Sequence, residues 1–377
     1  MNKHLHIISF DIPYPPDYGG VVDVFFKIKA LAECGAKIIL HCYEYGRKHS
    51  SELNKYCEQV HYYPRNISKG NFFSRMPYIV TSRESEELLK RLLQNDYPIL
   101  MEGLHTTYFL KDDALKDRVK IVRAHNIEHE YYKQLASTEK NLFRRSYYRN
   151  ASFKLRFYER VLNKAQWIAA ISPPDYHHFQ KKYQHAFYLP AFHPNEKVLS
   201  RTGKGDYALY HGNLEVAENN EAALFLINKV FSKCRHTLLI AGNKPSKELH
   251  AASSKYPNVV LKANETPDQI LSLIENAHVN ILPTFQSTGI KLKLITALFR
   301  GRHCIVNQYM VENTGLESLC IIANDEKKMT TALDNCFQAG FSTEEIEVRK
   351  QILESVFSNA SNAAMLIEKI GNNNQGS

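Results

Sequence analysis

Short apolar runs alternate with longer amphipathic stretches along most of this 377-residue chain. The apolar runs have the length of buried strands, and the amphipathic stretches have the three- and four-residue spacing of helices. In the first half, the predicted elements are the strands Leu5–Phe10, Ile38–Cys42, Val60–Tyr63, Ile99–Met101, Lys120–Ala124 and Trp167–Ile171 and the helix Val21–Cys34. This alternation predicts a mostly parallel sheet covered by helices, with ligand sites in loops at the carboxyl ends of strands.

A second series of the same kind follows a linker-like stretch, made of the Pro- and His-rich residues 189–194 and the polar residues 200–206. Its predicted elements are the strands Tyr207–Tyr210, Thr237–Ala241, Val259–Leu261, Val279–Leu282 and Cys304–Asn307 and the helices Asn219–Phe231, Pro267–Glu275 and Leu292–Arg300. The chain is too long for one core. We therefore predict an α/β protein with two Rossmann-like domains, residues 1–193 and 194–377, facing each other across a cleft. The final helix is able to pack back on the first domain.

Composition adds expectations about location and metals. No apolar run approaches the length that spans a bilayer, and the first ten residues lack a signal-peptide core, so we expect a cytoplasmic protein. The seven cysteines are odd in number, scattered and never in a C-x-x-C pair. This pattern predicts buried thiols in a reducing compartment, without a disulfide framework or a zinc site.

The net charge of +9 is unevenly distributed. Residues 1–190 contain 29 Lys and Arg against 20 Asp and Glu, whereas residues 191–377 contain 19 of each. The N-terminal half therefore holds the whole excess, which indicates that it faces something anionic. A membrane surface, a lipid pyrophosphate and nucleic acid all fit this charge.

Residues 140–160 concentrate this charge, with seven basic residues against one acidic residue. The basic residues are interleaved with Phe143, Tyr147, Tyr148, Phe153, Phe157 and Tyr158. On a helix, this pattern favours peripheral association with an anionic membrane, with aromatic anchors rimmed by Lys and Arg. A solvated helix that covers its own sheet has the same composition. The interleaving also suits single-stranded nucleic acid, but no recognised nucleic-acid module accompanies it, so we predict no nucleic-acid partner.

Residues 17–20 (Asp-Tyr-Gly-Gly) follow the first predicted strand and precede a helix predicted to begin near Val22. Gly19 and Gly20 at a helix entrance let backbone N–H groups approach an anion, and the helix N-terminus adds a partial positive charge. A phosphate-binding loop and a plain tight turn both fit this segment. It is not G-x-G-x-x-G, so no nicotinamide cofactor is predicted.

A polar segment, residues 123–132, follows the buried strand that ends at Ala124. His125, Asn126 and Glu128 supply hydrogen-bonding side chains that suit a polyhydroxylated ligand and are costly to bury unpaired. We predict that His125 is catalytic, although a lone histidine in such a place is also compatible with a structural role. His125 and His129 lack an evident third ligand, so no metal is predicted there.

Two segments of the second half resemble a diphosphate site. Residues 210–214 end the first strand of that half, and residues 284–293 join a strand to a helix. The candidate residues are Gly212, Asn213, Thr288, Gly289, Ile290, Lys291 and Lys293. A helix N-terminus with two ammonium groups binds a diphosphate without a metal, because the protein supplies the cations.

The order of three motifs resembles that of the retaining GT-B transferases of glycosyltransferase family 4. The motifs are residues 17–20, residues 123–128 (Arg-x-His-Asn-x-Glu) and residues 288–294 (Thr-Gly-Ile-Lys-Leu-Lys-Leu), the last followed by Ala297, Leu298 and Gly301. The likeness runs from about residue 5 to residue 365. It implies a GT-B fold and hexosyl transfer, with retention, from a nucleotide diphosphate sugar to a glycan or lipid-linked acceptor in cell-envelope or exopolysaccharide synthesis. It implies neither a divalent metal nor another cofactor.

The resemblance also implies roles for individual residues. The C-terminal lobe would hold the donor nucleotide, with Gly212, Lys291 and Lys293 along its diphosphate, and the N-terminal lobe would hold the acceptor. Gly19 and Gly20 would approach the donor phosphates, and His125 would contact the donor sugar or the charge that develops beside the acceptor.

The chain also departs from the pattern of that family. Where the family has two glutamates separated by seven residues, this chain has Thr288 and Thr296, and the usual Arg and Lys after the first donor-lobe strand are missing from residues 211–216. Threonine hydrogen-bonds a ribose hydroxyl only as a neutral group. Two alternatives therefore stand beside the transferase: a non-catalytic relative that binds a glycan or a partner, and a nucleotide-sugar epimerase of the same fold.

Overall fold

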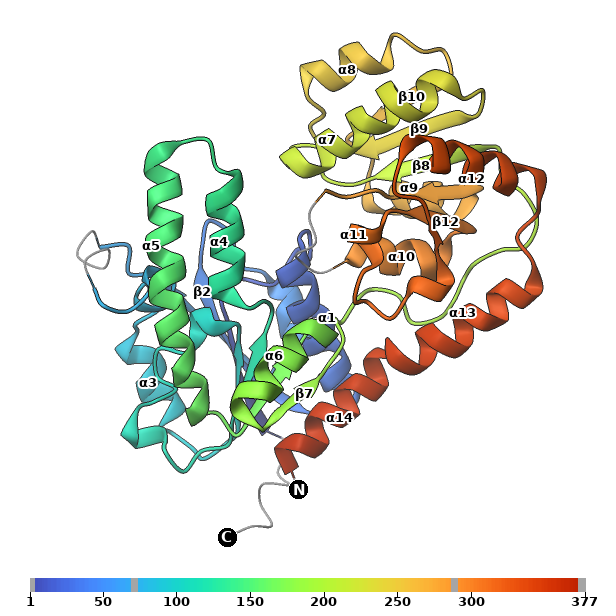
Figure 1. The fold of residues 1–377 in the computed structure, drawn as a ribbon. Helices are drawn as coiled ribbons and strands as arrows, with labels where there is room; N and C mark the ends of the chain where they lie inside the picture. The colour runs from blue at the N-terminus through green and yellow to red at the C-terminus, as the bar shows by residue number, and fades with distance from the viewer. Residues whose placement is uncertain (1–3, 69–73, 286–290, 372–377) are drawn as a thin grey trace. The chain divides into compact units, whose positions relative to one another are not determined.

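The structure is a computed structural model that describes residues 4–68, 74–285 and 291–371 (Figure 1). The described chain forms two compact units. Unit 1 contains residues from 4 to 193 and from 359 to 371, and unit 2 contains residues from 194 to 285 and from 291 to 358. The chain therefore passes from unit 1 to unit 2 and returns to unit 1 at its last helix.

Unit 1 is built on a parallel sheet in the order β3-β2-β1-β4-β5-β6-β7. Its strands are β1 (His4–Ser9), β2 (Lys37–Glu44), β3 (Gln59–Pro64), β4 (Ile99–Glu102), β5 (Lys120–Ala124), β6 (Trp167–Ala170) and β7 (Ala186–Tyr188). Its helices are α1 (Gly19–Glu33), α2 (Tyr78–Thr81), α3 (Glu86–Leu92), α4 (Glu128–Thr138), α5 (Leu142–Tyr158), α6 (Pro173–Tyr183) and α14 (Asn359–Gly371). The order reverses between β1 and β4, which is where an open α/β sheet leaves a crevice for ligands.

The central strands of unit 1 bury both of their faces, which explains their nearly continuous apolar sequences. Ile7 of β1 belongs to a core that includes Ile28 of α1, whereas the next residue, Ile8, belongs to a core that includes Leu155 of α5. α14 completes the first of these cores with Ala363 and Leu366. The last helix is therefore part of the hydrophobic core of unit 1.

Unit 2 repeats this architecture with a parallel sheet in the order β10-β9-β8-β11-β12-β13. Its strands are β8 (Tyr207–His211), β9 (Thr237–Gly242), β10 (Val259–Ala263), β11 (Val279–Ile281), β12 (His303–Val306) and β13 (Ile321–Ile322). Its helices are α7 (Ala217–Phe225), α8 (Lys247–Ser253), α9 (Pro267–Asn276), α10 (Leu292–Arg300), α11 (Gln308–Val311), α12 (Glu326–Gln338) and α13 (Thr343–Val356). Here the order reverses between β8 and β11.

The structure confirms an α/β protein with two Rossmann-like domains, and the predicted strands and helices are present with small shifts of their ends. Two elements differ from the predictions. α1 begins at Gly19, ahead of the predicted start at Val21 or Val22. The helix predicted over 219–231 begins at Ala217 and continues from α7 into a π-helical turn, Leu226–Val230. The short strands β7 and β13 lie at sheet edges and were not predicted, because two or three residues carry too little periodicity to detect.

Candidate functional site

Among the described residues, several long helices that follow central strands of the two sheets begin without a side-chain cap. They are α1 after β1, α4 after β5, α7 after β8 and α10 after β11. In contrast, side chains cap α5, α6, α9, α12 and α13. α1 and α10 also have no acidic residue in the first turn. Their positive N-terminal ends are therefore suited to an anionic ligand.

In unit 1, four charged side chains and one histidine form a buried network that we call the ionic cluster: Asp23, Lys27, Glu102, Arg123 and His125. The Lys27 ammonium lies 2.9 Å from Asp23 Oδ2 and 2.8 Å from Glu102 Oε1. The Arg123 guanidinium donates to both oxygens of Asp23, at 3.0 and 3.1 Å. All of these side chains except His125 are fully buried. The two carboxylates and two fixed cations balance one another.

The ionic cluster joins segments that are far apart in sequence. Asp23 and Lys27 lie one turn apart on α1, Glu102 ends β4, and Arg123 lies in β5. Asp23 also accepts a hydrogen bond from the backbone N–H of Phe192, at 2.8 Å. Burial by itself would raise the pKa of Asp23, but the charges of Arg123 and Lys27 hold it well below its usual range. The cluster therefore anchors α1 to the sheet beside the point where the strand order reverses.

His125 takes part in this network. Its Nε2 lies 3.1 Å from Glu102 Oε2 and 3.3 Å from Asp23 Oδ2, and its ring meets that of Phe10 edge-on at 5.4 Å. Burial acts to lower the pKa of His125, but the hydrogen bonds to Asp23 and Glu102 raise it on balance. These contacts give His125 structural partners, and its catalytic role stays a prediction.

The ligand atoms of Asp23, Glu102 and His125 lie within 4.8 Å of one another, which is close enough to surround a metal ion. However, the ammonium of Lys27 and the guanidinium of Arg123 already neutralise both carboxylates. A divalent cation would add charge to a site that has its own cations. The arrangement therefore favours an ion-pair network over a metal site.

Beside the ionic cluster lie two buried polar atoms for which the described residues provide no hydrogen-bond partner: Glu128 Oε1 and His105 Nδ1, 3.9 Å apart. Burial raises the pKa of Glu128 to about 7 and lowers the pKa of His105 well below its usual value. Both side chains are therefore able to be neutral near pH 7. A hydroxyl-bearing ligand is the kind of group that would satisfy both atoms.

The two glycines of the predicted phosphate loop lie in the first turn of α1. A Cβ atom at Gly20 would lie 2.8 Å from Cζ of Phe10, so a side chain does not fit there without a shift of that ring. Gly20 thus has a packing reason to be glycine, in addition to its place at an uncapped helix start. Asn126 lies next to His125, just before α4.

In unit 2, Lys291 and Lys293 lie at the start of α10, with Glu218 and Asn219 of α7 nearby; we call these four residues the lysine group. The Lys293 ammonium donates to Asn219 Oδ1 at 2.8 Å and lies 5.3 Å from the centroid of the Tyr210 ring. Burial lowers the pKa of Lys293 to about 8, although Glu218 acts to raise it. Burial also lowers the pKa of Lys291.

Gly212 and Asn213 connect the end of β8 to the lysine group. The carbonyl of Asn213 accepts from Asn219 Nδ2 at 2.9 Å, and a Cβ at Gly212 would lie 3.2 Å from the Asn219 side chain. Asn219 therefore bridges the loop after β8 to Lys293. His211, just before Gly212, has a buried Nε2 for which the described chain provides no hydrogen-bond partner, and burial lowers its pKa to about 3.

Three predicted site residues, Thr288, Gly289 and Ile290, lie outside the described residues. Thr296 is half-buried on α10, where its hydroxyl lies 3.4 Å from Asn195 Nδ2. Five residues were not predicted from the sequence: Asp23 and Lys27 of the ionic cluster, Glu218 and Asn219 of the lysine group, and His105 beside the ionic cluster. Asp23 and Lys27 carried a signal, because they stand four apart on the apolar face of a predicted helix, where a lone charge would be costly.

No family model matches the sequence. A Klebsiella pneumoniae protein described as an uncharacterized 44.6 kDa protein in the cps region is 25% identical over 344 residues, which cover 85% of this chain and 87% of that protein. Among solved structures, a glycosyltransferase from Rickettsia africae ESF-5 has a TM-score of 0.67 and 12% identity over 100% of both chains. The apo form of the lipopolysaccharide outer core galactosyltransferase WaaB has a TM-score of 0.64 and 14% identity over 96% of this chain and 99% of that one.

These likenesses define the class of fold. Two Rossmann-like domains with parallel sheets in a single chain form the GT-B architecture, and this chain has that fold. At this level of identity, the solved structures speak for the fold alone, because one fold supports many functions. The residues that bear on function are those of the ionic cluster and the lysine group.

Proposed function

We propose that the protein is a glycosyltransferase that moves a hexosyl residue from a nucleotide diphosphate sugar to a glycan or lipid-linked acceptor. The observation that carries this proposal is the lysine group. Lys291 and Lys293 are held in partly desolvated positions at the uncapped start of a helix that follows a central strand. A diphosphate would offset the cost of keeping two ammonium groups out of water, and it would accept hydrogen bonds from both.

The comparisons support a place in cell-envelope or exopolysaccharide synthesis. The relative from Klebsiella pneumoniae is a protein of the cps region, and WaaB is named as a galactosyltransferase of the lipopolysaccharide outer core. We place this protein in the cytoplasm, where nucleotide sugars serve as donors. It needs no further cofactor in this scheme.

The two units have different roles in the proposed reaction. In unit 2, Lys291 and Lys293 stabilise the diphosphate as it departs, so that no divalent metal is required for transfer. In unit 1, Gly19 and Gly20 offer backbone N–H groups at the start of α1 to a phosphate or hydroxyl group. Glu128 and Asn126 hydrogen-bond sugar hydroxyls, and the imidazole of His125 contacts the donor sugar or the charge that develops beside the acceptor. We propose retention of configuration on the resemblance to family 4.

A second candidate function rests on one specific observation. The two positions at which family 4 has glutamates are Thr288 and Thr296 here, and the Thr296 hydroxyl lies near Asn195. A neutral threonine holds a ribose less tightly than a carboxylate does. The second candidate is therefore a non-catalytic relative that binds a glycan or a partner protein with the same fold.

A single experiment separates the two candidates. The purified protein is incubated with a panel of nucleotide diphosphate sugars and a lipid-linked glycan extract, with and without a chelator, and release of the free nucleotide diphosphate is measured. We expect one donor to give acceptor-dependent release that resists the chelator and is lost in Lys293→Met. Binding without release in any combination would favour the non-catalytic relative. Release that does not need the acceptor would favour an epimerase.

We also propose that α5 attaches the protein to anionic membranes. Leu142, Phe143, Phe153 and Phe157 are all more than half exposed, and Phe143 reaches 90%. α5 packs beside α4 (Figure 1). No helix in the described ranges is long and apolar enough to cross a bilayer. The exposed aromatic side chains are suited to insert at the surface while neighbouring arginines contact lipid phosphates.

Liposome co-sedimentation tests this attachment. Each basic residue near an anionic surface contributes about 1 kcal/mol, so replacing Arg144, Arg145 and Arg149 by Gln should weaken binding to anionic vesicles by roughly 100-fold. Replacing three basic residues of unit 2, Lys247, Lys255 and Lys262, is the matched control and should leave binding unchanged. Binding that does not depend on anionic lipid would contradict the proposal.

A further inference from the structure

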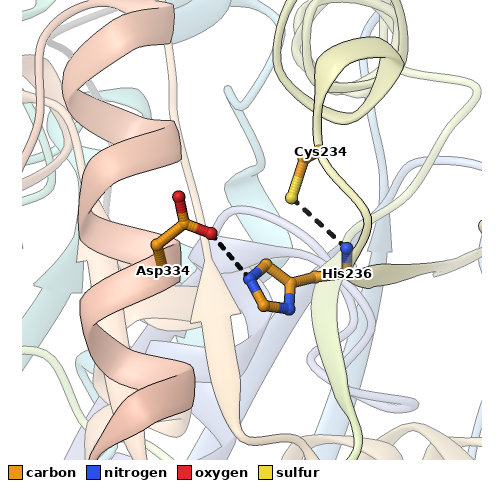
Figure 2. A group of neighbouring side chains, drawn as sticks. All are labelled: Cys234, His236 and Asp334. Carbon is orange, nitrogen blue, oxygen red and sulfur yellow. Dashed lines mark hydrogen bonds and ion pairs between the residues drawn. The ribbon is translucent and has the colours of Figure 1, made fainter.

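A second cluster of chemically active side chains lies in unit 2, away from the lysine group. It consists of Cys234, His236 and Asp334, whose ligand atoms lie within 4.8 Å of one another (Figure 2). His236 Nε2 lies 2.8 Å from Asp334 Oδ1, and the backbone N–H of His236 donates to Cys234 Sγ at 3.4 Å. Cys234 and His236 come from the turn before β9, and Asp334 comes from α12.

We propose that these three residues form a zinc site, with water as the fourth ligand. Thiolate, imidazole and carboxylate are the three ligand types that Zn²⁺ takes in proteins. Bond lengths of about 2.0–2.3 Å around a tetrahedral ion put neighbouring ligand atoms roughly 3–4 Å apart. The three ligand atoms lie within 4.8 Å of one another, and His236 and Asp334, 2.8 Å apart, would move apart to admit the ion.

The backbone that carries the ligands is held by a single side chain. Asn258 Nδ2 donates to the carbonyls of Phe231, Cys234 and His236, at 3.1, 2.8 and 3.1 Å. This amide fixes the turn from which both Cys234 and His236 project. A metal that binds here therefore meets two ligands whose main chain is already ordered, which lowers the entropy cost of binding.

The imidazole is positioned from its other side by α12. The His236 ring stacks on the ring of Phe337, with centroids 4.2 Å apart and planes 8° apart. Phe337 and Asp334 lie three residues apart on this helix, so the stacking partner and the third ligand share one rigid element. The stacking keeps the ring plane in place when the ion replaces the hydrogen bond to Asp334.

The location of the cluster separates it from the lysine group. His236 directly precedes β9, so the cluster lies at the amino edge of a parallel sheet, whereas the lysine group follows the carboxyl ends of β8 and β11. The side chain of Asp334 is 50% exposed, which leaves a path for the ion from solvent. A zinc ion here would tie α12 to the turn before β9. The proposed zinc site is independent of the metal-free transfer proposed above.

Cobalt titration tests the site directly, because tetrahedral Co²⁺ bound to a thiolate has a sulfur-to-metal charge-transfer absorption. The reduced, metal-free full-length protein is titrated with Co²⁺ and then with Zn²⁺. We expect a single charge-transfer band that saturates at one Co²⁺ per chain and is abolished by stoichiometric Zn²⁺. Zn²⁺ should also raise the melting temperature of the protein.

Variants assign the band to these residues. Cys234→Ser should abolish the band, and His236→Gln and Asp334→Asn should each weaken Co²⁺ binding by at least about tenfold. Cys320→Ser, which removes another half-buried thiol of unit 2, is the matched control and should keep the full band. Absence of the band in the wild type, its persistence in Cys234→Ser or its loss in Cys320→Ser would overturn the proposal. None of these readouts depends on transferase activity.

Discussion

The ionic cluster of unit 1 and the lysine group of unit 2 both hold charged side chains at the carboxyl ends of central strands, yet their charge balance differs. In the ionic cluster, the charges of Lys27 and Arg123 are matched by those of Asp23 and Glu102. In the lysine group, Glu218 is the acidic residue that acts on both Lys291 and Lys293, and burial lowers the pKa of each lysine.

This difference in charge balance indicates a structural role for the ionic cluster and a binding role for the lysine group. In a balanced buried network, each charge has a partner of opposite sign, so removing one member leaves a buried charge without its partner. A group with an excess of desolvated positive charge is stabilised when an anion arrives. We therefore expect substitutions in the ionic cluster to affect folding and substitutions in the lysine group to affect binding.

The largest expected effect is that of Lys27→Met on stability. The substitution leaves the Glu102 carboxylate buried without its main cation, which should cost about 3–5 kcal/mol. The protein has a single tryptophan, Trp167, and it lies in β6 of unit 1. Urea unfolding followed by its fluorescence therefore reports on unit 1. Lys293→Met in unit 2 is the matched control and should leave this transition in place; an equal shift would erase the distinction between the two groups.

The next effect concerns His125, which belongs to the balanced cluster but is also the predicted catalytic residue. His125→Gln keeps a hydrogen-bond donor but removes the titratable imidazole ring. We expect the turnover of the transferase to fall about 10²–10³-fold while the affinity for nucleotide diphosphate changes little. A loss of unit 1 stability with full specific activity of the remaining folded protein would instead assign His125 to the scaffold alone.

A smaller effect is expected from Glu128, because its folded pKa of about 7 lies above the ordinary value of 4.5. The folded state binds this proton more tightly, so the contribution to stability is complete below pH 4.5 and is lost as the pH rises to about 7. Glu128→Gln should therefore stabilise unit 1 by about 2–3 kcal/mol at pH 8. The gain should vanish near pH 4.5, and a gain that does not depend on pH would refute the burial argument.

The smallest effect is on ligand affinity. Lys293→Gln should weaken binding of a nucleotide diphosphate by about 1.5–3 kcal/mol at pH 7 and leave nucleoside binding unchanged. Because the pKa of Lys293 is lowered to about 8, the wild-type affinity should itself fall as the pH rises through 8. Calorimetric titrations at pH 7 and 9 measure both changes. Lys291→Ala should behave similarly at pH 7, and equal losses for nucleoside and diphosphate would make both lysines ordinary surface charges.

The sequence predicted the fold well because the central strands of both sheets are buried on both faces. Such strands are nearly continuous apolar runs, as in Leu5–Phe10 and Ile99–Met101, and their apolar sequences reveal them. The edge strands β7 and β13 were not predicted because they are short. The start of α1 at Gly19 was also not predicted, because glycine has a low helix propensity.

The candidate site was only partly predictable. Gly212, Lys291 and Lys293 were found because they adjoin predicted strand ends and helix starts. The bridging role of Asn219 was not predicted. A polar residue in the first turn of a helix gives no sequence pattern that distinguishes a bridging side chain from a solvated one. Likewise, sequence spacing cannot show that Glu102 and Lys27, 75 residues apart, form one ion pair.

The placement of α14 in the core of unit 1 has a consequence for how the chain folds during its synthesis. Leu366 fills the core of unit 1, and the ammonium of Lys369 lies 4.2 Å from the centroid of the Trp167 ring. Ribosomes make proteins from the amino end, so the residues of unit 2 are synthesised before those that complete unit 1. The N-terminal half of the chain must therefore wait, with one apolar face uncovered, until its last helix emerges. This apolar face of unit 1 therefore stays uncovered while unit 2 is synthesised.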